Sequence, residues 1–183
     1  MTESKIIGLQ NHNEDLNKLV CESLQSALLL ILKNKEYSKI SVTEICQKAG
    51  VSRTAFYNNF QTIDNLLERV VLEYNKTLII DKIGSPFRET TNKEWYIKLF
   101  KCVKENADFL LTLFNAGFQG KYLSIINDIV LHNKNIPATK KYLRIIWAGG
   151  VVNTVICWLE DGMKEDIEEI ADFCFQNLSS YSS

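Results

Sequence analysis

The chain has 183 residues, 46% of them hydrophobic, and a formal net charge of −1. This length fits one or two compact domains and is sufficient to bury a core. The near-neutral charge argues against recognition of a polyanion through the overall field of the protein, so a charged partner requires a local patch. Only two prolines occur, which favours an ordered, largely helical protein.

Five cysteines are spread along the chain, and no two of them have CxxC spacing. They are Cys21, Cys46, Cys102, Cys157 and Cys174. An odd number without metal-type spacing favours free thiols in a reducing compartment over a disulfide framework or a zinc site. Residues 1–13 are polar and lack the apolar core of a signal peptide. We therefore expect a cytoplasmic protein without a bound metal.

The first predicted helix runs from Glu14 to about Asn34. Apolar side chains recur along it at helical spacing, at Leu16, Leu19, Val20, Leu24, Ala27, Leu28 and Ile31. This amphipathic pattern predicts a helix that packs behind the segment that follows it. Residues 33–40 are predicted to form a turn, with Tyr37 and Ile40 anchored in a small core.

The segment from Ser41 to Phe60 predicts two short helices joined by a tight turn. Ser41 and Glu44 have capping-box spacing, in which each side chain accepts a hydrogen bond from a free backbone N–H. Gly50 follows the first helix where a left-handed backbone suits glycine, and Ser52 is placed to cap the second helix. This order is the helix-turn-helix pattern, whose second helix enters the major groove of DNA.

Three parts of this segment resemble the DNA-binding signature of TetR/AcrR-type transcriptional regulators. They are Ile40-Ser41-Val42-Thr43-Glu44-Ile45, Ala49-Gly50-Val51-Ser52-Arg53 and Phe56-Tyr57-Asn58-Asn59-Phe60. The similarity covers about Leu16 to Leu72. It implies an all-α protein of about nine helices. A three-helix DNA-binding domain would occupy residues 14–78, with the helix-turn-helix at 41–60, and a helical ligand-binding and dimerisation domain would occupy residues 79–183.

Arg53 is the leading candidate for a base contact, because a guanidinium can form two hydrogen bonds with guanine N7 and O6. An ion pair with Glu44, or a phosphate contact alone, is the alternative. Thr54 is placed to touch a base edge or a thymine methyl group, with packing as its alternative. The resemblance places the Tyr57 hydroxyl on a phosphate, and packing over the first helix is the alternative. Further phosphate partners are expected at Thr43, Lys48, Ser52 and Asn58.

The local charge suits this interpretation, although the chain departs from the family pattern. From Lys33 to Phe60 five cations face two acids, a balance of +3, which fits a groove-binding module or a solvated face. Many relatives carry arginine or another large polar or aromatic residue near Asn58. Many also have a lysine at the start of the fourth helix, where this chain has Ile63.

Further helices are predicted along the rest of the chain. Thr62 is placed to cap a fourth helix that continues to about Ile80, and the clearest break follows from Gly84 to Asn92. In the family the fourth helix links the DNA-reading unit to the body. Later helices are predicted at about residues 93–106, 107–115, 122–134, 138–161 and 165–179, with a flexible connection from Gly117 to Gly120.

The predicted helix at residues 138–161 is apolar nearly all round. A membrane span would need about 20 such residues, and this run is shorter, so we expect burial against both its own core and a second subunit. Together with the last helix it would form a four-helix homodimer interface, which the resemblance also implies; a monomeric bundle is the alternative. Candidate dimerisation residues are Trp147, Gly150, Val151, Thr154, Trp158, Ile170 and Cys174.

The sequence offers no catalytic constellation or cofactor motif. His12 and His132 lack partners at metal or triad spacing. Cys46 is expected to be a buried side chain, with a redox switch as the alternative. The resemblance implies an effector pocket among residues 93–159. Aromatic residues that could line it, or simply form the core, are Trp95, Phe100, Phe109, Phe114, Phe118, Tyr122, Trp147 and Trp158. No ligand-binding residue is assigned.

The favoured hypothesis is therefore a non-enzymatic, ligand-responsive repressor that binds a palindromic double-stranded DNA operator as a homodimer, with a small-molecule effector and no membrane partner. The alternative is a co-activator or adaptor with weakened DNA contacts that pairs with another regulator. Asn58 and Ile63 favour that alternative. A small helical enzyme has no supporting pattern.

Because Ile63 removes one expected phosphate contact, operator binding should depend only weakly on salt. Each neutralised phosphate contributes about −0.9 to the slope of log affinity against log salt concentration. Gel shifts on the operator across a salt series measure this slope. A slope steeper than about −8 would contradict the prediction.

Overall fold

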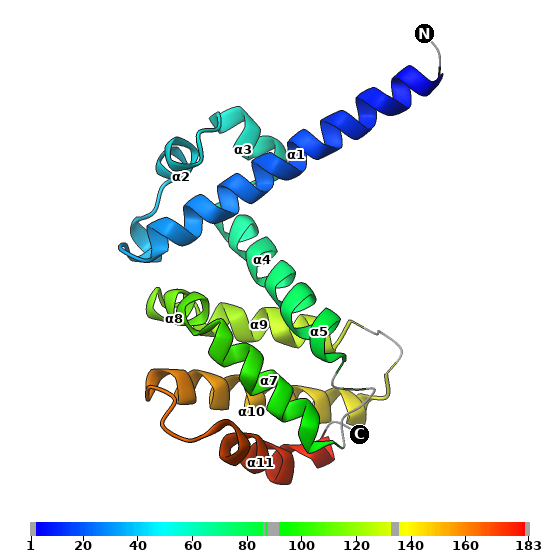
Figure 1. Ribbon diagram of the computed structural model, residues 1–183, viewed down its shortest axis with the longest axis vertical. Helices are drawn as coiled ribbons and strands as arrows, with labels where there is room; N and C mark the ends of the chain where they lie inside the picture. Colours follow the sequence, from blue (N-terminus) through cyan, green and yellow to red (C-terminus); the bar gives the residue numbers. More distant parts are fainter. Residues whose placement is uncertain (1–2, 86, 88–91, 133–135, 182–183) are drawn as a thin grey trace. The chain divides into compact units, whose positions relative to one another are not determined.

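The computed structural model describes residues 3–85, 87, 92–132 and 136–181, and most of the predicted break after Gly84 lies outside them. Nine α-helices of seven or more residues occur in these ranges, which contain no strand, so the predicted all-α class is confirmed (Figure 1). The chain divides into two compact units, Met1–Val70 and Val71–Ser183. The sequence instead places the domain boundary after residue 78, and that boundary stays a prediction.

The first unit is built on a long helix, α1 (Glu3–Leu32), that packs against α2 (Val42–Ala49) and α3 (Arg53–Asn59) (Figure 1). The predicted start at Glu14 is wrong, because backbone hydrogen bonds extend a helix beyond the end of its apolar face. Side chains without exposed surface form the core, namely Leu24, Leu28, Ile45, Phe56, Leu66 and Leu67.

Two contacts fix the start of the next helix, α4 (Ile63–Tyr74), within the first unit. The Thr62 hydroxyl accepts a hydrogen bond from the Asn65 N–H at 3.1 Å, which confirms the predicted cap. The Tyr37 hydroxyl, from the short 3-10 turn Tyr37–Lys39, donates to the Asp64 carboxylate. Ile40, beside that turn, is buried as predicted.

The second unit is a bundle of helices. A π-helical segment (Asn75–Ile80) and α5 (Asp81–Ile83) precede the rest of the bundle. Its longer helices are α7 (Lys93–Glu105), α8 (Ala107–Asn115), α9 (Gln119–Val130), α10 (Ala138–Glu160) and α11 (Ile167–Leu178). α7 packs against α11, and α10 packs against both α9 and α11 (Figure 1).

Helix boundaries in the second unit differ from the prediction, and two of the differences have a clear physical reason. The predicted α-helix to Ile80 gives way to π-helix at Asn75, whose side-chain amide donates to the Val71 carbonyl at 2.9 Å. A side chain that binds this carbonyl competes with the backbone donor that an α-helix would use. α9 begins at Gln119 rather than Tyr122, because Gly117, with φ of 84°, is sufficient to turn the chain.

α10 is the only helix of the described ranges long and apolar enough to cross a membrane by length and composition. A core helix passes the same test, so this is a weak indication of a membrane span. Seven residues of α10 are buried within the second unit, including Trp147 and Trp158. The apolar character of α10 is therefore explained in large part by the core of its own unit.

The burial of the cysteines predicts their reactivity. Cys46 and Cys174 are buried, and burial raises the pKa of the Cys46 thiol and brings that of Cys174 to about 11. In the native protein at neutral pH, iodoacetamide should leave both residues unmodified, whereas in denaturant all five cysteines should react. Peptide mass spectrometry reads the outcome. Labelling of native Cys46 at the denatured rate would favour the redox-switch alternative.

Candidate functional site

The turn between α2 and α3 is formed by local hydrogen bonds that the sequence predicts. Gly50 adopts a left-handed conformation with φ of 69°. The Gly50 and Val51 N–H groups donate to the carbonyls of Gln47 and Cys46 at 3.3 and 3.0 Å, the pattern of a Schellman motif. The Ser52 hydroxyl accepts a hydrogen bond from the Ala55 N–H at 3.1 Å, which confirms the cap of α3.

Only half of the predicted capping box at α2 is present. The Ser41 hydroxyl accepts a hydrogen bond from the Glu44 N–H at 3.3 Å. The Glu44 carboxylate, however, binds the Lys35 ammonium group at 2.7 Å. A hydrogen bond to the carboxylate is charge-assisted with either donor, but only Lys35 adds the attraction of a full opposite charge, so Lys35 takes the carboxylate. Among residues 33–60, all of which the structure describes, Glu44 forms no ion pair with Arg53.

The outward face of α3 carries four of the seven predicted DNA-binding side chains. Arg53, Thr54, Tyr57 and Asn58 are all exposed. Phe56 is 0% exposed and faces the core. The rings of Phe56 and Tyr57 meet at an interplanar angle of 87°, and Tyr57 remains 49% exposed. The Tyr57 side chain is therefore accessible to a partner.

The other predicted contact residues lie on α2 and in the turn. Thr43 and Lys48 are exposed on α2, and Ser52 is exposed at the start of α3. The Ser52 hydroxyl is also the cap of α3, so a phosphate contact there would share that oxygen. The helix-turn-helix thus presents all seven predicted residues to solvent; their role in DNA binding remains a proposal.

Asn59 has a role that the sequence does not reveal. Its side-chain N–H donates to the Ala55 carbonyl at 2.9 Å, and its carbonyl oxygen accepts a hydrogen bond from the Cys21 thiol at 3.3 Å. These two contacts connect the end of α3 to α1. Asn59 is therefore a positioning residue for α3, and only the spacing between it and the inward-facing Phe56 could have suggested this.

Ion pairs leave a small positive patch around the helix-turn-helix. The two acids of this region are paired, Glu44 with Lys35 and Glu36 with Lys39, the latter at 2.9 Å. Over residues 33–60, all of which the structure describes, three cations have no ion-pair partner, namely Lys33, Lys48 and Arg53. They carry the local positive balance and are free to bind phosphate groups.

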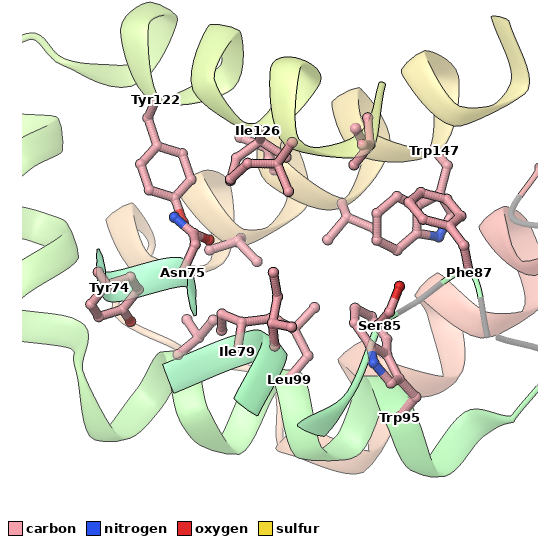
Figure 2. Close-up of a pocket in the computed structure, with 18 of the residues that line it drawn as sticks. Tyr74, Asn75, Ile79, Ser85, Phe87, Trp95, Leu99, Tyr122, Ile126 and Trp147 are labelled. Atoms are coloured by element: carbon pink, nitrogen blue, oxygen red, sulfur yellow. The ribbon is translucent and has the colours of Figure 1, made fainter. Parts of the chain in front are cut away.

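The second unit contains a partly open cavity of about 250 Å³. Its walls come from residues 74, 75, 79, 80, 85 and 87 and from α7, α8, α9 and α10; many of these side chains are drawn in Figure 2. Trp95, Tyr122 and Trp147 line it, but the other suggested aromatics, Phe100, Phe109, Phe114, Phe118 and Trp158, are not among its lining residues. The expected range of residues 93–159 also omits Tyr74 and Asn75, because the π-helical segment that places Asn75 in the wall has no simple sequence signal.

Most predicted dimerisation side chains lie inside their own unit. Trp147, Val151, Trp158 and Cys174 are buried, and the Trp147 N–H donates to the Tyr96 hydroxyl at 2.9 Å. Bulky rings on α10 fill the bundle core because such rings bury the most apolar area. Their place in a dimer interface remains untested.

The remaining candidates on these helices are partly accessible. Ile170 and Thr154 are half-buried, and the Thr154 hydroxyl donates to the Gly150 carbonyl at 2.8 Å. A Cβ atom on Gly150 would lie 2.7 Å from a methyl group of Leu178, so this glycine permits packing within the chain. Large exposed apolar side chains on the two helices are instead Tyr142, Ile146 and Phe173.

No group of three or more His, Cys, Asp or Glu residues in the described ranges is placed to hold a metal ion. The exposed cations and hydroxyls of α2 and α3 thus define a surface suited to a phosphate backbone, and the cavity is a separate, mostly apolar site in the second unit. Such a combination is typical of a DNA-binding protein with a site for a small ligand.

Comparison with protein families identifies the class. Residues 30–70 match the bacterial regulatory proteins of the tetR family, and residues 90–180 match a TetR-type transcriptional regulator C-terminal region. Together the two matches cover more than two thirds of the chain. The chain therefore belongs to the TetR family of transcriptional regulators. A comparison with curated proteins finds no match.

Several solved structures share the fold. The TetR transcriptional regulator from Streptococcus agalactiae 2603V has a TM-score of 0.59 at 17% identity, covering 92% of this chain and 98% of that one. The dihydroxyacetone kinase operon activator DhaS has a TM-score of 0.55 at 19% identity, covering 88% and 94%. The fatty acid degradation regulator FadR from Bacillus halodurans has 0.52 at 18% identity, covering 87% and 94%. At these identities the likeness shows the fold alone.

Replacing Arg53 with alanine should weaken specific DNA binding by about 5- to 150-fold, the effect of losing a bidentate base contact worth about 1–3 kcal/mol. Fluorescence anisotropy on the DNA upstream of the gene measures this change. Lys101→Ala, which removes an exposed cation from α7, serves as the control and should bind normally. Unchanged affinity of Arg53→Ala would refute the base contact.

Proposed function

We propose that the protein is a ligand-responsive transcriptional repressor that binds a palindromic operator as a homodimer in the cytoplasm, and that it is not an enzyme. The observation that carries this proposal is the outward face of α3, where Arg53, Thr54 and Tyr57 are exposed opposite the buried Phe56. This face matches the requirement of a recognition helix, whose exposed side chains must reach base edges and phosphates.

The small positive charge of a single helix-turn-helix supports the proposed homodimer. Only three cations around it have no ion-pair partner among residues 33–60, so one copy gains little from phosphate contacts. A second copy doubles the contacts, and its binding is intramolecular once the first is bound. A two-fold dimer presents two identical recognition helices, so its operator is a near-palindrome.

The exposed surfaces of α10 and α11 are the proposed contact between subunits. Tyr142, Ile146 and Phe173 are exposed there. A Cβ atom on Gly149 would meet no atom within 4 Å, so the α10 backbone is open to close approach. Four such helices, two from each subunit, would bury apolar side chains that are costly to leave in water.

The cavity supplies the proposed response to a ligand. Tyr74, the last residue of α4, and Asn75 both line it. A ligand that prefers one arrangement of these residues also prefers one arrangement of α4, which in the chain directly follows the helix-turn-helix. The ligand then changes operator affinity only as far as it distinguishes the two states.

The second candidate is an activator or adaptor that pairs with another regulator. Asn58 and Ile63 stand where many relatives have residues suited to DNA contacts, and among the proteins with a similar fold is an operon activator, DhaS. Purified protein mixed with the DNA upstream of its gene separates the two candidates. A repressor shifts this DNA alone and lowers transcription from it in vitro, whereas an adaptor shifts it only with its partner.

The proposed interface on α10 predicts that a charge introduced there weakens the homodimer. Ile146 is 51% exposed, so Ile146→Glu should leave the subunit folded but bury a carboxylate in the dimer. The dimer dissociation constant should rise at least about tenfold, as measured by sedimentation equilibrium. Lys101→Glu on α7 provides the control with a similar exposed carboxylate, and its dimer should be unaffected. An unchanged dimer in Ile146→Glu would place the interface elsewhere.

A further inference from the structure

The cavity has hydrogen-bonding groups near one end. Tyr122 points from α9 toward Asn75, and Tyr74 lies beside them (Figure 2). The Tyr122 hydroxyl donates to the Asn75 carbonyl oxygen at 3.3 Å, and both side chains are more than nine-tenths buried. Buried amides are uncommon in an apolar wall unless they are fully bonded or have a ligand.

The hydrogen bonds of these groups are only partly used. One Asn75 amide hydrogen goes to the Val71 carbonyl and its oxygen accepts from Tyr122, which leaves one amide hydrogen and acceptor positions on both oxygens. The Tyr74 hydroxyl is also buried and has no hydrogen-bond partner in the described part of the chain. Leaving a buried donor unsatisfied is unfavourable. These groups can therefore bind one further polar group that both donates and accepts.

The cavity favours a neutral group. None of its described lining residues is charged. Burial raises the pKa of Tyr122 to about 12 and raises that of Tyr74 as well, so both hydroxyls stay neutral at physiological pH. A carboxylate placed there would lose its water without gaining a cation. Arg144 contacts two lining residues of the cavity. Its guanidinium lies over the Phe87 ring and donates a hydrogen bond to the Val130 carbonyl, so it already has partners.

The opposite end of the cavity is aromatic. Phe87, Trp95 and Trp147 lie together there (Figure 2), and the Trp147 ring centroid is 5.2 Å from that of Phe87 and 5.6 Å from that of Trp95. The positive charge of Arg144 on Phe87 disfavours a second cation at these rings. The cavity volume, about 250 Å³, lies near the lower end of the range of about 300–1,000 Å³ that is common for ligand pockets, so the ligand is small.

We propose that this cavity binds a small neutral molecule whose apolar, ring-sized body lies against Trp95 and Trp147. Its single hydroxyl group bonds to the Asn75 amide and to the hydroxyls of Tyr122 and Tyr74. Asn75 begins the π-helical segment, a backbone form that is frequent at functional sites. The ligand thus contacts Asn75, whose side-chain amide also binds the Val71 carbonyl at the start of the π-helical segment. This proposal rests on the proposed ligand-responsive function only for the effect of the ligand on DNA binding. Binding of the ligand to the cavity can be measured without DNA.

Four probes with the same phenylpropyl body test the chemical class. They are 3-phenylpropan-1-ol, propylbenzene, 3-phenylpropanoate and 3-phenylpropylamine, titrated into the full chain without DNA. Two of the three tryptophans line the cavity, so tryptophan fluorescence reports binding. The alcohol should bind about tenfold more tightly than each of the others. Tighter or equal binding of a charged probe, equal binding of propylbenzene, or no binding of the alcohol would overturn the proposal.

Conservative variants test the residues. Tyr122→Phe should weaken binding of the alcohol about tenfold and leave propylbenzene unchanged, and Tyr74→Phe provides a second variant if Tyr122→Phe fails to fold. Tyr181→Phe, in the 3-10 turn Ser179–Tyr181 and outside the cavity lining, is the matched control and should bind as the parent does. Equal loss for both probes would indicate altered packing and refute the hydroxyl contact. A gel shift without probe tests DNA binding separately, so the two proposals can fail independently.

Discussion

The burial of Phe56 determines how the first unit presents its surface. With no exposed area on this ring, rotation of α3 about its axis would expose apolar area at about 25 cal/mol for each Å². Because the face is fixed in this way, Arg53, Thr54 and Tyr57 point outward together. Asn59 adds a second restraint through Cys21 on α1. The position of the exposed face of α3 is thus set by residues that are not part of that face.

Much of the first unit could be predicted because its signals are local. The Ser52 cap, the left-handed Gly50 and the Thr62 cap each depend on residues within one turn, so their spacing in the sequence is sufficient. The Glu44 carboxylate was harder to place because its partner, Lys35, lies in the preceding turn. The Glu44 carboxylate could accept from the Ser41 N–H or pair with Lys35, and only the folded structure shows which partner it has.

The second unit was less predictable because periodicity identifies a buried helix without saying what covers it. α10 is apolar nearly all round, which suggested a partner subunit on one side. In the folded chain Trp147 and Val151 of α10 line a cavity, whereas Trp158 and Leu159 fill the core of the bundle. An apolar helix can thus face a partner subunit, a cavity or the core of its own bundle, and the amino-acid pattern is the same in all three cases. The side chains left for a partner are fewer than the pattern implies.

The π-helical segment at Asn75–Ile80 has a consequence for comparing relatives. Hydrogen bonds that reach back five residues rather than four accommodate more residues in each turn than an α-helix does. A relative with uninterrupted α-helix between the equivalents of Thr62 and Gly84 would present different side chains to its cavity unless its chain were shorter there. Alignments across this stretch therefore need a gap within a helix, and without it the counterpart of Asn75 would be assigned to the wrong residue.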